Sequence, residues 1–169
     1  MNYLEDFVAQ WYEYKGFFVR RNVLVGKRSA GGYECELDVI ALHPGEGRLV
    51  HVEPSMDAHS WKTREDRFRK KFAAGKKYIP ELFSGLQVPE EIDQIALLGY
   101  GSKRNHSHLG GGRIMLVDEL LREVLLALKE HRIASNAVPE DKPIIRTLQY
   151  VAEFHGTVGD VFGERTARN

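Results

Sequence analysis

The 169-residue chain is poor in cysteine, with Cys35 as its single thiol. One cysteine excludes an internal disulfide framework and a four-cysteine zinc site, and such a chain suits a reducing compartment. We therefore expect a cytoplasmic protein. No apolar run approaches the roughly 20 residues that span a bilayer. The acidic N-terminal segment lacks the basic start of a signal peptide, so no membrane partner is expected.

The chain also lacks an excess of charge of either sign. Lysine and arginine number 24, and aspartate and glutamate also number 24. This balance excludes a uniformly basic nucleic-acid coat protein, but a locally basic surface remains open because charges can be segregated on a fold. Hydrophobic residues make up 43% of the chain, which is enough for a packed core and excludes a disordered protein.

Hydrophobic periodicity predicts an α/β protein. Helical spacing covers residues 3–15, 60–78, 118–131 and 141–154, and predicted strands cover 17–25, 33–42, 48–53, 92–100 and 113–117. Strands punctuated by helices around one core predict a three-layer sandwich with a central mixed β-sheet. The length suits one domain, which we place at residues 1–155 with a C-terminal tail at 156–169.

Acidic residues alternate along the second predicted strand, at Glu34, Glu36 and Asp38. Alternate side chains of a strand share a face, and a short turn pairs this strand with the next one, so Asp38 is expected near Glu53. Two neighbouring carboxylates are costly to bury unless a cation or a proton compensates them. Because hard oxygen ligands suit Mg²⁺ or Mn²⁺, we expect a metal site here.

Two segments, ELDVIA at 36–41 and VHVEPS at 50–55, resemble the core of the PD-(D/E)XK nuclease superfamily. The nearest likeness is to Holliday-junction resolvases and Mrr-like restriction endonucleases. The resemblance covers residues 3–100 and implies a restriction-endonuclease-like αβββαβ core, followed here by C-terminal helices. It also implies magnesium-dependent hydrolysis of DNA phosphodiester bonds. A homodimer is a further expectation, because resolvase-like relatives are often dimers.

The resemblance also assigns site residues. Asp38 and Glu53 match the two metal-binding acids of the superfamily. Glu5 matches an acid that many members add from the first helix, although a glutamate there also suits the helix dipole. Glu36 is a further candidate ligand. His51, on the same strand face as Glu53, we interpret as a partly buried polar neighbour.

The motif departs from the superfamily at Ser55. The pattern places a lysine there, two residues after the second acid, to orient and activate the attacking water. Serine supplies no positive charge, so Lys62 is the first candidate to replace it and Lys71 the second. If neither reaches the site, the chain is a catalytically inactive nuclease-fold protein that binds nucleic acid or a protein partner. An α/β interaction module whose acids only solubilise a sheet edge is the third hypothesis.

Eight basic residues crowd into 62–77. A helix with basic flanks beside a buried face can follow nucleic-acid phosphates, and a solvated helix surface is the alternative. The predicted DNA contacts are Arg64, Arg69, Lys71 and Lys76. The basic, glycine-rich loop 101–113 is expected to close over a substrate or grip its backbone.

Overall fold

The computed structural model describes residues 3–101 and 103–163. Its six-stranded sheet has the order β1-β2-β3-β4-β6-β5. The strands are β1 Phe18–Lys27, β2 Tyr33–His43, β3 Arg48–Ser55, β4 Asp93–Leu98, β5 His108–Leu109 and β6 Gly112–Leu116. The pairs β3–β4 and β4–β6 are parallel, whereas β1–β2, β2–β3 and β5–β6 are antiparallel. The sheet is therefore mixed, as predicted.

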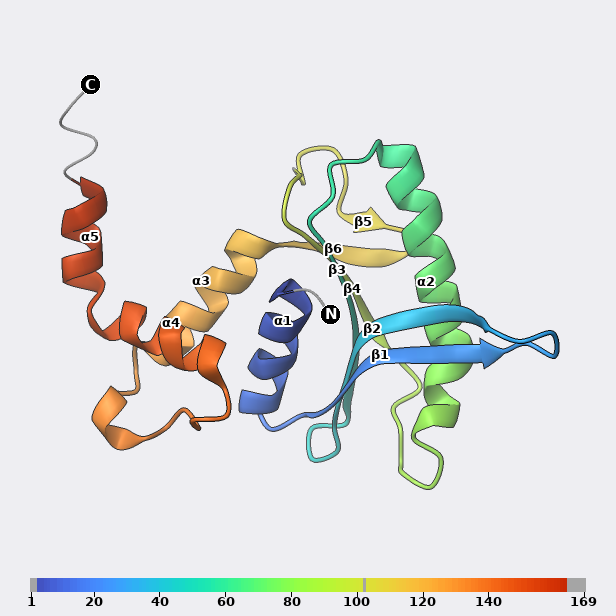
Figure 1. The fold of residues 1–169 in the computed structure, drawn as a ribbon, viewed down its shortest axis with the longest axis horizontal. Coiled ribbons are helices and arrows are strands. Elements are labelled where there is room, and N and C mark those ends of the chain that lie inside the picture. Colours follow the sequence, from blue (N-terminus) through green and yellow to red (C-terminus); the bar gives the residue numbers. More distant parts are fainter. Residues whose placement is uncertain (1–2, 102, 164–169) are drawn as a thin grey trace. The chain divides into compact units, whose positions relative to one another are not determined.

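Two helices, one on each face of the sheet, complete the three layers (Figure 1). Helix α1, Tyr3–Tyr14, covers one face of the sheet, and α2, Trp61–Leu82, covers the other. Each helix buries an apolar stripe at helical spacing, formed in α1 by Leu4, Phe7, Val8 and Trp11 and in α2 by Phe68, Phe72 and Ile79. The predicted three-layer α/β sandwich is confirmed.

Strands β2 and β3 separate part-way along their length. Their ladder runs from the Arg48–His43 pair to the Val52–Val39 pair. Beyond that point β2 is paired with β1, and β3 is paired with β4 as far as Ser55. The two strands therefore form a fork, with Asp38 and Glu53 one position past the last shared pair.

Helix α2 is longer than the sequence predicted. Ser60 caps it, accepting a hydrogen bond from the Thr63 backbone N–H at 3.4 Å. The helix then continues through Pro80 to Leu82, although Pro80 was expected to lie beyond its end. Proline lacks a backbone N–H, so it removes one helical hydrogen bond, and the helix ends two residues later.

The predicted loop 101–113 contains part of a small hairpin. Strands β5 and β6 pair at residues 108–109 and 112–113, and Gly110 has φ +61°. A Cβ on Gly110 would lie 2.3 Å from the Arg69 backbone N, and one on Gly112 would lie 2.4 Å from Cε2 of Phe72. These glycines therefore let the hairpin lie directly against α2.

The chain divides into two compact units, Met1–Glu119 and Leu120–Asn169, where the sequence predicted one domain to residue 155. Most of α3, Val117–Leu128, belongs to the second unit, together with the short 3₁₀ helix Ile133–Ser135, α4 Pro143–Glu153 and α5 His155–Gly163. Helix α5 occupies part of the predicted tail, where glycines at 156, 159 and 163 weaken the helical signal. None of the described helices has both the length and the apolarity to cross a membrane.

Candidate functional site

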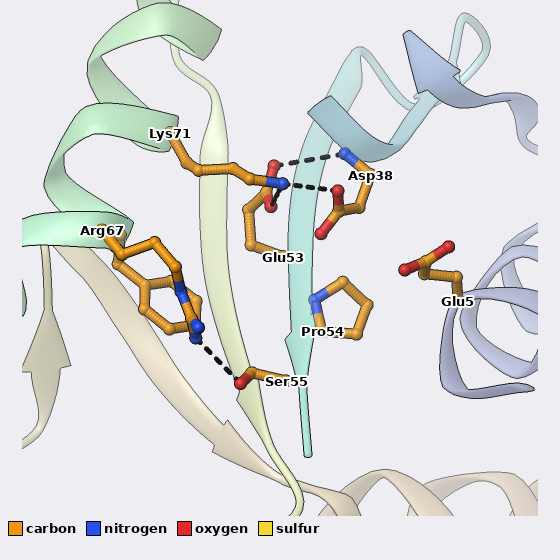
Figure 2. Close-up of a pocket in the computed structure, with 8 residues that line it drawn as sticks. Glu5, Asp38, Glu53, Pro54, Ser55, Arg67 and Lys71 are labelled. Atoms are coloured by element: carbon orange, nitrogen blue, oxygen red, sulfur yellow. Dashed lines mark hydrogen bonds and ion pairs between the residues drawn. The ribbon is translucent and has the colours of Figure 1, made fainter. Parts of the chain in front are cut away.

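A pocket of about 230 Å³ opens at the fork between β2 and β3. Four elements line it: α1 contributes Glu5, β2 contributes Asp38, β3 contributes Glu53, Pro54 and Ser55, and α2 contributes Arg67, Phe68 and Lys71. Figure 2 shows Glu5 directed from α1 toward Asp38, and Lys71 reaching from α2 to the two acids. The pocket therefore gathers charged groups that are up to 66 residues apart in the chain.

Lys71 bridges the two acids. Its Nζ lies 2.5 Å from Oδ1 of Asp38 and 2.6 Å from Oε2 of Glu53. The three side chains are largely buried, with exposed fractions of 22% for Lys71, 14% for Asp38 and 3% for Glu53. Lys62, the first candidate from the sequence, is exposed in the first turn of α2 and does not line the pocket. Lys71, the second candidate, thus places an ammonium between the two acids.

Glu53 is fixed by a second set of donors. Its Oε1 accepts from His51 Nε2 at 2.7 Å and from the Asp38 backbone N–H at 3.2 Å. The side-chain amide of Gln94 donates to the Phe72 carbonyl at 2.8 Å and faces His51 Nδ1 at 3.4 Å. This assigns the Nε2–H tautomer to His51, because Nδ1 faces a donor and Nε2 faces a carboxylate.

His51 is more deeply placed than the sequence suggested, since it is fully buried. Burial and the nearby Lys71 lower its pKa to about 3, so the imidazole is neutral. Gly75 of α2 makes room for the ring, because a Cβ at that position would lie 2.4 Å from His51 Nδ1. His51 therefore acts as a neutral hydrogen-bond donor that orients Glu53.

The charges in the pocket shift one another's ionisation. Burial, with Glu53 alongside, raises the pKa of Asp38 to about 7. Burial also raises the pKa of Glu53, against the hydrogen bonds from Asp38 and Lys71. Burial opposes the charge of Lys71, but the two carboxylates outweigh it and raise the pKa of this lysine. Near neutral pH, Lys71 is thus protonated, whereas Asp38 titrates between its neutral and its charged form.

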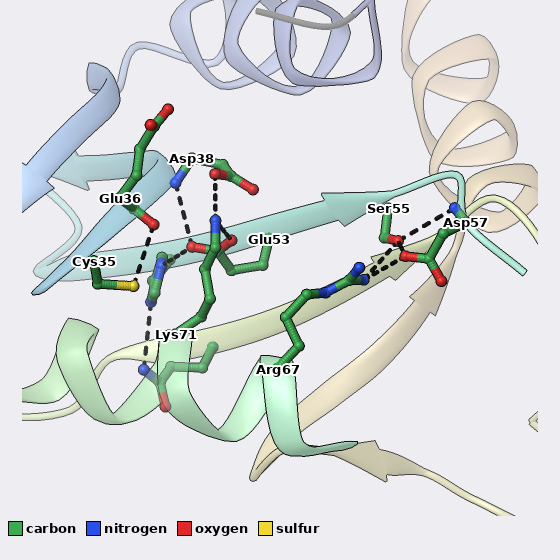
Figure 3. Close-up of polar contacts among 10 residues, drawn as sticks. Cys35, Glu36, Asp38, Glu53, Ser55, Asp57, Arg67 and Lys71 are labelled. Carbon is green, nitrogen blue, oxygen red and sulfur yellow. Dashed lines mark hydrogen bonds and ion pairs between the residues drawn. The ribbon is translucent and has the colours of Figure 1, made fainter. Parts of the chain in front are cut away.

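A second polar cluster lies at the end of β3 and is drawn in Figure 3. Arg67 Nη2 donates to Ser55 Oγ at 2.9 Å and forms an ion pair with Asp57 Oδ2, to which the Ser55 hydroxyl also donates. Although burial opposes it, the hydrogen bonds from Ser55 and Arg67 lower the pKa of Asp57 to about 2. Ser55 is thus part of an arginine–aspartate cluster.

The remaining candidate ligands have different positions. Glu5 lines the pocket, but Glu36 does not and is exposed. Alternation along the strand predicted that Glu36 and Asp38 share one surface beside β3. Asp38 lies one position past the last β2–β3 pair, whereas Glu36 lies three positions past it, where β2 is paired with β1 alone. Glu34 instead accepts a hydrogen bond from the Tyr78 hydroxyl at 2.5 Å.

The predicted DNA contacts on α2 separate in the same way. Lys71 lines the pocket, and Arg64 is buried with Nη2 donating to the Tyr100 carbonyl at 3.1 Å. Arg69 and Lys76 are exposed, and Arg69 forms ion pairs within α2. The sequence reasoning left out Arg67. Its signal was the spacing of Arg64, Arg67 and Lys71 at i, i+3 and i+7, which places them along one helix side.

The donor set of the pocket suits a hard divalent cation. Asp38 and Glu53 offer carboxylate oxygens at the fork, with Glu5 in the same lining. In the described part of the chain, no three His, Cys, Asp or Glu side chains gather closely enough to hold a metal by themselves. Any cation bound here would have to complete its coordination shell with water or with substrate oxygens, as Mg²⁺ usually does.

The chain matches no protein-family model and no curated protein.

Proposed function

We propose that this protein is a metal-dependent nuclease that hydrolyses phosphodiester bonds of DNA, with Lys71 in the role that the superfamily pattern gives to position 55. The observation that carries the proposal is the position of Lys71 Nζ, within 2.6 Å of a carboxylate oxygen from each acid. An acid from β2, an acid from β3 and an ammonium meet at one fork, as the PD-(D/E)XK resemblance implies.

Charge balance in the pocket supports a role for a cation. Its lining carries three carboxylates, Glu5, Asp38 and Glu53, against the two cations Lys71 and Arg67. The formal charge is therefore −1 when all five groups are ionised. A phosphodiester adds another negative charge, and like charges in a partly buried site repel strongly. A divalent cation would remove this conflict and admit the substrate.

Each residue then has a separate task. Asp38 and Glu53 would hold Mg²⁺ or Mn²⁺, which lowers the pKa of bound water and stabilises charge on the phosphate. Lys71 stays protonated, so it orients the attacking water and stabilises negative charge as a hydrogen-bond donor rather than accepting a proton. His51 and the Asp38 backbone N–H keep Glu53 in one orientation.

The alternative is a nuclease fold that binds DNA without cutting it. One observation favours this second candidate. Both oxygens of Glu53 already have partners, with Oε1 bonded to His51 and the Asp38 N–H and Oε2 to Lys71. A carboxylate that is satisfied in this way also suits a purely structural ion cluster.

Cleavage assays distinguish the two candidates. Plasmid, single-stranded, duplex and four-way-junction DNA are incubated with Mg²⁺ or Mn²⁺ and the wild type, Lys71→Met or Asp38→Asn. Each substitution is expected to slow cleavage by a factor of about 10² to 10⁴, the usual contribution of one positioned catalytic group. Lys70→Met is the matched control, because Lys70 is the exposed neighbour on the same helix. Wild-type protein that cuts none of these DNAs with either metal would leave the non-cutting alternative.

A further inference from the structure

The pocket has a second cationic end, which the proposed chemistry does not use. Arg67 lines the same cavity as Lys71, one helical turn earlier on α2. Its side chain is 41% exposed, whereas its partner Asp57 is 19% exposed. The guanidinium is thus paired with a largely buried acid, and it still faces the cavity.

Three neighbours fix the orientation of this guanidinium. Asp57 and Ser55 both bind Nη2, and the ring of Phe68 lies 5.1 Å from the guanidinium carbon. Asp57 is itself held, since Oδ1 accepts from the His59 backbone N–H at 3.1 Å and lies 3.7 Å from Arg64 Nε. The arginine is therefore pre-organised before any ligand arrives.

The donors of Arg67 are only partly used. In the described part of the chain its polar contacts all involve Nη2. One N–H on Nε and two on Nη1 remain available, and this planar set of donors matches the oxygens of a phosphate. The Arg113–Asp93 pair makes a useful contrast. There Nε and Nη2 of Arg113 donate to the two oxygens of Asp93 at 2.8 and 2.9 Å, so the aspartate occupies both of these guanidinium donors.

The small side chain of Ser55 leaves room in the pocket for both Arg67 and Lys71. It is buried, and its hydroxyl lies 2.9 Å from Arg67 Nη2. A lysine at this position would bring an ammonium against the guanidinium. A small hydroxyl instead accepts a hydrogen bond from it. The loss of the motif lysine thus accompanies the presence of an arginine in the same part of the pocket.

We propose that Arg67, held by Asp57 and Ser55, is a phosphate-binding subsite that contacts a DNA phosphate next to the one being cut. This inference rests on the proposed function for its choice of substrate. The subsite orients the strand across the pocket, with the acids and Lys71 at one end and Arg67 at the other. Arg67 is accordingly a binding and positioning residue, and its loss raises KM more than it lowers kcat.

The test measures DNA binding separately from cleavage. Fluorescence anisotropy with labelled duplex DNA, in Ca²⁺ and over a range of salt, compares the wild type with Arg67→Gln, Arg67→Lys and Arg113→Gln. Arg113→Gln is the matched control, because Arg113 lies on β6 and outside the pocket lining, and the variant removes the same charge from an arginine–aspartate pair of similar exposure, 43%. Arg67→Gln is expected to weaken binding about tenfold to a hundredfold, the range for hydrogen bonds to charged groups, and to reduce the salt slope by about 0.9.

The other variants sharpen the result. Arg67→Lys is expected to keep the salt slope but lose part of the affinity, because lysine lacks the planar donor set of the guanidinium. Arg113→Gln is expected to match the wild type. Thermal unfolding of each variant identifies losses that arise from misfolding, for which Arg67→Lys is the milder substitution. If Arg67→Gln binds like Arg113→Gln while the wild type cuts DNA, the subsite is refuted and the nuclease stands. If Arg67→Gln weakens binding but no protein cuts, the phosphate contact of Arg67 stands as part of a DNA-binding surface and the nuclease is refuted. Wild-type protein without salt-dependent DNA binding would overturn both.

Discussion

The basic side chains of α2 form two groups that share one helix and differ in what they contact. The inner group, Arg64, Arg67 and Lys71, bonds to groups outside α2, namely Asp38, Glu53, Asp57 and the Tyr100 carbonyl. The outer group, made up of Lys62, Arg69 and Lys76, is exposed. Composition alone treats the two groups alike. The phase of the helix decides which cations bond to acids outside α2 and which extend from the helix into solvent.

The largest expected difference between the groups is in stability. Lys71→Met leaves Asp38 and Glu53 without their counterion, and breaking a buried ion pair from one side costs about 3 to 5 kcal/mol. The neighbouring exposed Lys70→Met is expected to change the free energy of unfolding by less than about 0.5 kcal/mol. Urea unfolding at about pH 8 measures both.

The pH dependence of that loss provides its control. The pKa of Asp38 is raised from 3.8 to about 7 in the folded protein, so the native state binds more protons than the unfolded state between these values. Stability therefore falls as pH rises through about 7. Removing Lys71 raises the pKa of Asp38 further, so the loss in Lys71→Met is expected to be larger near pH 8 than near pH 5. Equal losses at both pH values would contradict the assigned role of Lys71.

A smaller effect is expected where the inner side of α2 meets His51. Alanine favours a helix over glycine by up to about 1 kcal/mol, but a Cβ at position 75 would lie 2.4 Å from His51 Nδ1. Gly75→Ala is therefore expected to lose about 1 to 3 kcal/mol, as over-packed cores do. In a His51→Ala background the same change is expected to be neutral or stabilising. A double-mutant cycle measures the coupling, and an identical loss in both backgrounds would show that His51 is not the cause.

The smallest effect per residue is expected from the outer group. Neutralising Lys62, Arg69 and Lys76 together is expected to leave stability nearly unchanged, because exposed ion pairs contribute little. The slope of log affinity against log salt should fall by about 0.9 for each phosphate of duplex DNA that the variant no longer neutralises. Anisotropy titrations over a salt series measure this slope. An unaltered slope would assign the outer group to solvation and confine DNA binding to other surfaces.

Site residues that depend on local patterns could be predicted from the sequence, whereas those that depend on the packing of distant segments could not. Alternation in the strands is local, and it brought Asp38 and Glu53 together because the short β2–β3 turn fixes their register. The choice between Lys62 and Lys71 depended on where α2 crosses the sheet, over a separation of 33 residues from Asp38. Glu36 lies three positions past the last shared β2–β3 pair and does not line the pocket, whereas Asp38 lies one position past it and does. A pattern of alternation does not reveal where the pairing of two strands ends.

The position of Lys71 on α2 also has a consequence for the order of assembly. Asp38 and Glu53 belong to strands, so backbone pairing brings them together as soon as the sheet forms. Lys71 arrives only when α2 docks through Phe68, Phe72 and Ile79. A sheet without its helix would hold two adjacent carboxylates and no ammonium, and their repulsion disfavours that intermediate unless they take up protons. Docking of α2 and completion of the charged site are thereby coupled into one step.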